Sequence, residues 1–276
     1  MTIKQRKVMF LTGCASGIGK HLADRFLEEG HQIYCTDIDL EAMRAWIDTS
    51  EHTADRVAMQ KLDVRQPEDW KSALDEAAKT FGEIDVVMNI AGYLKPGYVE
   101  SITKAEVDMH LDVNVKGVMY GTQVAAERMV EQGRGHIVNV GSLASLTPVP
   151  GLSLYGASKF AVRGFSLAVA EELRERGVAV SVVLLDAVKT PMLDLQADYE
   201  EAALTFSGPR PLTLDEVERL IVDEVLEERP LEVTLPRSRG MMARFAGLAP
   251  DVTRLLGPLL TRLGKRAQKT YEVDED

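Results

Sequence analysis

Residues 8–20 read VMFLTGCASGIGK, and this stretch decides the fold. It opens with a short, continuous apolar run, as a fully buried parallel strand does. Beyond the first glycine, Ile18, Leu22 and Phe26 recur at helical spacing. A glycine loop between a buried strand and a helix lets the backbone approach a pyrophosphate. The spacing is G-x-x-x-G-x-G rather than the general dinucleotide pattern G-x-G-x-x-G, and glycines also serve plain turns, but the position of this loop favours phosphate binding.

Strand patterns alternate with helical patterns along the rest of the chain. Further strands are predicted at 32–36, 57–62, 84–88, 135–140, 178–185 and 231–235, and the longer helices at 67–81, 104–132, from 154 onward and at 214–225. This alternation predicts a parallel sheet covered by helices on both faces. Ligands bind such sheets at the carboxyl ends of the strands, where the polar residues discussed below lie.

Asp37 ends the second strand, about 20 residues after the glycine loop, where a carboxylate would bind a ribose 2′-hydroxyl and repel a 2′-phosphate. No arginine in the loop or the following corner would neutralise such a phosphate, so NAD is predicted over NADP. NADP use requires Lys20 to reach the phosphate. Alternatively, Asp37 caps the next helix, a role that Asp39 could fill equally.

Tyr155 and Lys159 stand four residues apart in a predicted helix and therefore share a face. A close ammonium favours the phenolate and lowers the tyrosine pKa from its usual value of ~10. Ser142, at the end of a strand, could hydrogen-bond the same substrate oxygen. Tyr-x-x-x-Lys is a common pattern, however, and an ordinary amphipathic helix would also contain it.

Two asparagines have open interpretations. Asn114 lies among apolar helix positions, and a buried amide needs partners, so it is either a structural hydrogen-bonding residue or part of a site. Asn89 begins the sequence Asn-Ile-Ala-Gly at a strand end, which suits a tight exit beside a cofactor and equally a plain turn.

In their order and spacing these motifs resemble the short-chain dehydrogenase/reductase family over roughly residues 6–236. The resemblance implies a Rossmann-type doubly wound sheet of about seven strands in a catalytic domain, 1–236, with 237–276 as a helical extension of the same domain. It implies that Tyr155 is the general acid/base, that Ser142 orients the substrate oxygen, and that Lys159 holds the nicotinamide ribose. Asn114 would anchor a water relay behind Lys159.

The same resemblance implies the cofactor contacts and an oligomer, a homodimer or homotetramer. The implied cofactor residues are Gly13, Ser16, Gly17, Ile18, Gly19, Asp37, Asp63, Val64, Asn89, Ala91, Gly92, Tyr155, Lys159, Val188 and Thr190. No metal site is predicted.

Two positions depart from the family pattern. Ile90 replaces a second asparagine, and Leu185-Asp186 replaces a Pro-Gly pair. The glycine position lies near the nicotinamide in the family, so a carboxylate at Asp186 would favour the oxidised, positively charged ring. Alternatively, Asp186 faces solvent or caps the next helix.

The amino-acid composition argues against several classes of binding partner. The chain has 276 residues and a formal charge of −11, which argues against nonspecific binding to nucleic acid. It contains no apolar run near the ~20 residues that span a bilayer, and a cytoplasmic location is expected. Its two cysteines indicate neither a disulfide framework nor a zinc site.

The extension differs from the body in charge. Residues 237–269 contain eight basic residues and one acid, so they carry +7 while the remainder carries −18. Segments 241–246 and 255–263 mix apolar and basic residues as interfacial helices do, which fits peripheral membrane contact. Packing on the acidic body or on a neighbouring subunit fits the same composition and is favoured, because helices of soluble proteins share it.

The apolar residues of the segment 192–209, with Tyr93, Leu94, Val149 and Leu152, predict a pocket for a hydrophobic substrate. We therefore predict an NAD-dependent oxidoreductase that transfers a hydride between nicotinamide and a hydrophobic secondary alcohol or ketone. The alternatives are a membrane-associated NAD(P)H-dependent reductase of a lipid-like ketone and a non-catalytic NAD-binding protein. Substrate identity and direction are not predicted.

Overall fold

Seven parallel strands form one sheet in the computed structural model, which describes residues 6–49 and 55–271. The strand order is β3-β2-β1-β4-β5-β6-β7. The strands are β1 (Val8–Thr12), β2 (Gln32–Asp37), β3 (Val57–Lys61), β4 (Val86–Asn89), β5 (Gly135–Val140), β6 (Val178–Leu185) and β7 (Glu232–Leu235). All five residues of β1 are buried, as its apolar run predicts. The order reverses between β1 and β4, which makes their carboxyl ends a topological switch point.

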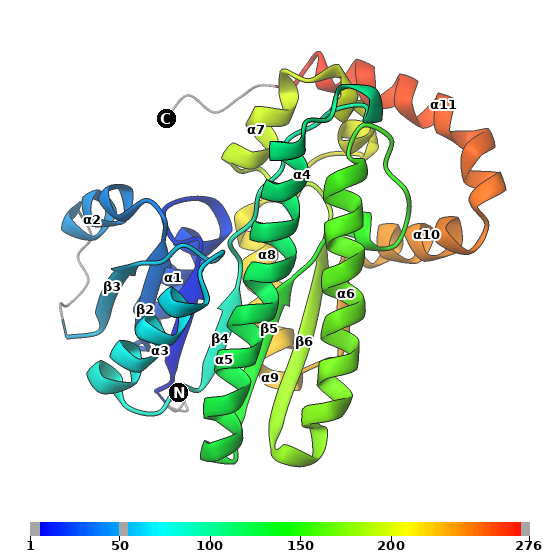
Figure 1. The fold of residues 1–276 in the computed structure, drawn as a ribbon. Coiled ribbons are helices and arrows are strands. Elements are labelled where there is room, and N and C mark those ends of the chain that lie inside the picture. The colour runs from blue at the N-terminus through cyan, green and yellow to red at the C-terminus, as the bar shows by residue number, and fades with distance from the viewer. Residues whose placement is uncertain (1–5, 50–54, 272–276) are drawn as a thin grey trace.

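Helices cover both faces of the sheet, and the predicted architecture is confirmed (Figure 1). The helices are α1 (Gly17–Glu28), α2 (Leu40–Thr49), α3 (Pro67–Phe81), α4 (Lys104–Leu111), α5 (Gly117–Gln132), α6 (Ser153–Leu173), α7 (Pro191–Ala197), α8 (Leu214–Arg219), α9 (Leu226–Glu228), α10 (Arg237–Leu248) and α11 (Pro250–Gln268). One buried apolar cluster joins the sheet to α1, α2 and α8, and a second joins it to α3, α5 and α6. The core therefore lies in two layers.

Two helices that the sequence pattern predicts as continuous contain π-helical turns. Asp112–Lys116 connects α4 to α5, and Leu220–Val225 connects α8 to α9. Shorter 3-10 turns occupy Val99–Ser101, Leu143–Ser145, Arg174–Arg176 and Glu200–Ser207. The first π turn contains Asn114, and such turns occur frequently at functional sites.

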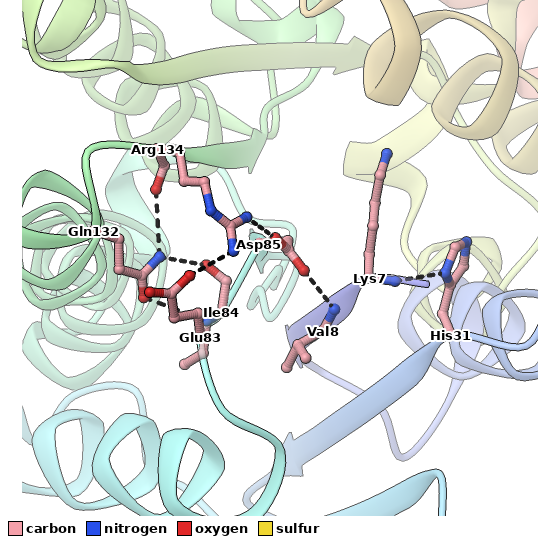
Figure 2. Close-up of polar contacts among 8 residues, drawn as sticks. All are labelled: Lys7, Val8, His31, Glu83, Ile84, Asp85, Gln132 and Arg134. Atoms are coloured by element: carbon pink, nitrogen blue, oxygen red, sulfur yellow. Dashed lines mark hydrogen bonds and ion pairs between the residues drawn. The ribbon is translucent and has the colours of Figure 1, made fainter. Parts of the chain in front are cut away.

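A polar network ties together the amino ends of the central strands, at the edge opposite the glycine loop (Figure 2). Asp85 accepts a hydrogen bond from the Val8 N–H at 2.9 Å and pairs with Arg134, which also contacts Glu83 at 2.6 Å. Gln132 donates to the Ile84 carbonyl at 3.0 Å. These contacts join the entries to β1, β4 and β5, so this edge is structural.

The extension packs on the body rather than standing free. A Cβ on Gly264 of α11 would collide with the Ala203 carbonyl, which places the helix backbone directly on the Glu200–Ser207 turn. Lys265 pairs with Glu200 at 2.9 Å. The Gln268 amide contacts the carbonyls of residues 196, 197 and 199. No helix in the described part of the chain combines the length and apolar character needed to cross a membrane.

Candidate active site

The glycine loop packs against the residues that directly follow β4. Gly13 and Gly17 have φ values of 76° and 53°, which favour glycine, and a Cβ on Gly19 would collide with the Gly13 carbonyl. The Thr12 hydroxyl accepts hydrogen bonds from the Ile90 and Ala91 N–H groups at 3.0 and 3.1 Å. The first turn of α1 follows this loop and begins without a side-chain cap from Ser16. Its N–H groups suit a phosphate.

Other predicted cofactor residues meet at this loop. A Cβ on Gly17 would lie 3.3 Å from the Thr190 methyl group, and one on Gly92 would lie 3.6 Å from the Asn114 amide oxygen. The Thr190 hydroxyl contacts the Val188 carbonyl at 3.1 Å. Residues from β1, β4, the π turn and the segment after β6 are thus brought together.

Asp37 supports the loop instead of capping α2. Its carboxylate accepts hydrogen bonds from the Ala15 and Asp39 N–H groups, each at 3.0 Å. Asp39 accepts from the Ala42 N–H at 3.0 Å and is therefore the helix cap. The carboxylate of Asp37 consequently lies beside the loop, where a ribose would need it.

Three predicted cofactor residues have their own structural contacts. Asp63 pairs with Arg65 at 2.8 Å, and the hydrogen bond from this guanidinium lowers the pKa of the Asp63 carboxyl. Val64 is buried, and its side chain packs where a Cβ on Gly117 would lie. The Asn89 amide donates to Asn139 at 2.7 Å within a buried network, so its side chain is directed into the core.

Ser142, Tyr155 and Lys159 lie together. Ser142 follows β5, and its side chain is close enough to Tyr155, near the start of α6, to lower the pKa of that tyrosine. The Lys159 ammonium lies 5.5 Å from the centroid of the Tyr155 ring and donates to the Val140 carbonyl at 2.9 Å. The predicted helical pairing of Tyr155 and Lys159 therefore exists, with the lysine buried.

The pKa values of this pair differ from expectation. Burial raises the pKa of Tyr155 to about 12, and the Ser142 hydroxyl opposes this increase. Burial also lowers the pKa of Lys159 to about 8. The expected lowering of the Tyr155 pKa is not found, because the cost of placing a charge in the protein interior exceeds the opposing effect of the Ser142 hydroxyl. At neutral pH Tyr155 is a proton donor and Lys159 is largely charged.

Asn114 is completely buried and spans two segments. Its amide oxygen accepts from the Tyr93 N–H at 2.7 Å. Its amide nitrogen donates to the Tyr93 carbonyl at 2.8 Å and to the Ser158 hydroxyl at 3.0 Å. Asn114 thus fixes the segment after β4 against α6. Its contact on α6 is Ser158, the residue immediately before Lys159.

Asp186 is neither a free charge nor a cap. Its carboxylate, 15% exposed, pairs with Arg239 of α10, whose side chain is 27% exposed. Burial raises the pKa of the Asp186 carboxyl, and Arg239 opposes the increase. The extension thus supplies a counter-charge at the carboxyl end of β6.

Three contributing residues were not predicted from the sequence: Ser158, Arg65 and Arg239. Ser158 lies one residue from Lys159, so its place on the same helix was a usable signal. Arg65 follows Asp63 by two residues, a spacing that allows a local ion pair. Arg239 carries no local signal, because its partner Asp186 follows β6, 53 residues earlier in the sequence.

Comparison with known proteins agrees with this geometry. A family model described as short chain dehydrogenase matches residues 7–200. A (2S)-[(R)-hydroxy(phenyl)methyl]succinyl-CoA dehydrogenase subunit from Thauera aromatica is 35% identical, with 74% of this chain and 82% of that protein covered. A cyclohexanol dehydrogenase from Acinetobacter is 33% identical, with 74% and 80% covered. A 3-alpha-(or 20-beta)-hydroxysteroid dehydrogenase from Mycobacterium tuberculosis is 36% identical, with 68% and 71% covered.

Solved structures share the fold. A short chain dehydrogenase/reductase from Burkholderia phymatum in complex with NAD has a TM-score of 0.80 at 24% identity, covering 92% of this chain and 97% of that one. The protein ElxO with NADP bound has a TM-score of 0.75 at 24% identity, covering 85% and 100%. The chain belongs to the short-chain dehydrogenase/reductase family and is an oxidoreductase of alcohols or ketones.

Proposed function

We propose that this protein is an NAD-dependent oxidoreductase that transfers a hydride between nicotinamide and a hydrophobic secondary alcohol or ketone. The observation that carries the proposal is the grouping of the Ser142 and Tyr155 side chains with the buried Lys159 ammonium, which lies 5.5 Å from the centroid of the Tyr155 ring. This arrangement offers one proton donor and one orienting hydroxyl to a single substrate oxygen. A redox-sensing or scaffold protein would have no use for it.

The proton chemistry belongs to Tyr155. When bound, the nicotinamide supplies or accepts the hydride at the substrate carbon. In ketone reduction, the Tyr155 phenol donates its proton to the substrate oxygen, while Ser142 holds that oxygen by a second hydrogen bond. In alcohol oxidation, the same proton returns to Tyr155. The positive charge of Lys159 limits the cost of the intervening phenolate.

The cofactor would lie along the carboxyl edge of β1, β2 and β4. The glycine loop and the start of α1 fit a pyrophosphate, and the Asp37 carboxylate fits a ribose 2′-hydroxyl. The same carboxylate would repel a 2′-phosphate, which supports NAD over NADP. Lys159 would hold the nicotinamide ribose, and Asn114 would anchor water behind it.

A hydrophobic substrate is supported by the segment after β6. Leu193 and Phe206 of this segment are buried, and the Met192 methyl group lies 3.8 Å from where a Cβ on Gly92 would be. Leu94, in the segment after β4, and Leu152, immediately before α6, are also buried. The relatives named for a cyclic alcohol and for hydroxysteroids support the same substrate class. A homodimer or homotetramer is proposed from the family alone.

Substitution of Tyr155 tests the proposal. Tyr155→Phe should lower kcat by about 10²- to 10⁴-fold, the usual contribution of a positioned acid/base, with NAD⁺ affinity retained. Tyr98→Phe, at an exposed tyrosine, is the matched control. The assay follows NADH absorbance with secondary alcohols of increasing chain length. Equal activity of Tyr155→Phe and wild type would refute the proposed role, and no turnover of any alcohol or ketone by wild type would refute the function.

A further inference from the structure

Exposed apolar side chains concentrate on the two helices of the extension. Fourteen large apolar side chains are exposed in the described part of the chain, and seven of them lie on α10 and α11. They are Met241, Met242, Phe245, Leu248, Leu255, Leu259 and Leu263. Such a concentration differs from the single exposed apolar residues of an ordinary surface and marks an interaction site.

These side chains form an outer face on each helix. On α10, Gly240, Ala243 and Gly247 face the body, since a Cβ on Gly247 would collide with the Leu146 carbonyl. Phe245 and Leu248 lie on the opposite side and are 66% and 82% exposed. Both helices lie at the periphery of the molecule, with α10 at the right of the sheet and α11 running along the top towards α7 (Figure 1).

The same face of α11 carries its apolar and its unpaired basic residues. Leu255 and Leu259 are 81% and 58% exposed and stand four apart, while Gly264 and Gln268 face the body. Arg262 and Arg266 continue the outer stripe at helical spacing, and both are exposed. The result is an amphipathic helix whose solvent side is apolar and basic.

The basic residues of the extension fall into two groups. Four pair with carboxylates of the body: Arg237 with Glu224, Arg239 with Asp186, Arg244 with Glu232 and Lys265 with Glu200. The other four, Arg254, Arg262, Arg266 and Lys269, have no ion pair with any described residue. They remain available to a partner with negative charge.

We propose that the outer face of α10 and α11 docks on an anionic lipid surface. Leucine, methionine and phenylalanine side chains flanked by arginines match the requirements of helices that lie in the membrane interface. A second copy of this chain is a poorer occupant, because a two-fold contact would bring the basic stripe against itself. Residues 1–236 carry a net charge of −14, so this face, rather than the body, would be attracted to acidic headgroups.

Vesicle sedimentation of the full chain tests the proposal. Wild type should bind phosphatidylcholine vesicles that contain phosphatidylserine, more weakly at high salt, and should bind phosphatidylcholine alone poorly. Arg262→Gln with Arg266→Gln should lower the partition coefficient by about 30-fold. Phe245→Ser with Leu248→Ser should lower it further than the matched control Leu231→Ser, at an exposed leucine elsewhere.

Three results would overturn the proposal. Wild type that fails to bind the anionic vesicles removes it, as does binding that both double variants leave unchanged. Analytical ultracentrifugation provides the third: self-association of wild type that Phe245→Ser with Leu248→Ser abolishes would assign the face to a second copy. Circular dichroism spectra identical to wild type establish that each variant is folded.

Discussion

Arg239→Met should destabilise the protein by leaving the Asp186 carboxylate without its counter-charge. The Asp186 side chain is 15% exposed and that of Arg239 is 27% exposed. Removing one partner from a fully buried pair costs about 3–5 kcal/mol, and an exposed pair contributes about 0–1 kcal/mol. The intermediate exposure of this pair therefore predicts a loss of about 2–3 kcal/mol in the free energy of unfolding at neutral pH.

A double-mutant cycle separates the ion pair from other effects of substitution. Urea unfolding followed by circular dichroism, at one protein concentration, would compare Arg239→Met, Asp186→Asn and the double variant. Arg237→Met is the matched control, because Arg237 is 74% exposed and pairs with Glu224 on the surface. The control should lose at most about 1 kcal/mol.

The pH dependence supplies a second criterion. Burial already raises the Asp186 pKa, and loss of Arg239 removes the contact that opposes this increase. A carboxyl whose folded pKa is raised destabilises the fold as pH rises through that pKa, so the loss in Arg239→Met should shrink as pH falls. A loss that is independent of pH, or single-variant losses that simply add in the double variant, would refute the reasoning.

Three further predictions concern the loop, the extension and the core. Asp37→Asn removes the charge that would repel a 2′-phosphate, so the ratio of kcat/KM for NADP⁺ over NAD⁺ should rise at least about tenfold in steady-state assays; an unchanged ratio would show that Asp37 does not discriminate. Gly264→Ala should loosen α11, since its Cβ would collide with the Ala203 carbonyl, whereas Gly257→Ala meets nothing within 4 Å and should be neutral or slightly stabilising; limited proteolysis that attacks both variants equally would contradict this packing. Burial lowers the His136 pKa to about 3, so unfolding free energy should fall by about 3 kcal/mol between pH 7 and ~4 as the unfolded chain takes up the proton; urea unfolding of His136→Asn should lack this part of the acid sensitivity, and an identical pH slope in variant and wild type would contradict it.

The sheet could be predicted because its strands are buried apolar runs. The pattern located β5 and β6 at their observed bounds, since a parallel strand covered on both faces leaves little choice of residue. The apolar pattern did not predict the π turn at Asp112–Lys116. The spacing of apolar residues along the sequence changes little when one turn of a long helix widens. Local periodicity therefore predicts the presence of a helix better than its internal geometry.

The site could be predicted only as far as contacts are local. Tyr155 and Lys159 meet because four residues separate them on a helix, but the Tyr155 pKa depends on burial that only the tertiary structure provides. The partner of Asp186 lies 53 residues away, on α10. Its charge state could not be read from the neighbouring sequence, since ion pairs between distant segments leave no periodic signal.

The contacts of Gln268 have a consequence for how the protein is made. Its amide contacts the carbonyls of residues 196, 197 and 199, at the end of α7. Gln268, which fastens the end of α7, is thus synthesised 69 to 72 residues after the carbonyls that it contacts. During synthesis, the nascent chain can form the glycine loop and the strands around it long before Gln268 is available to hold α7 in place.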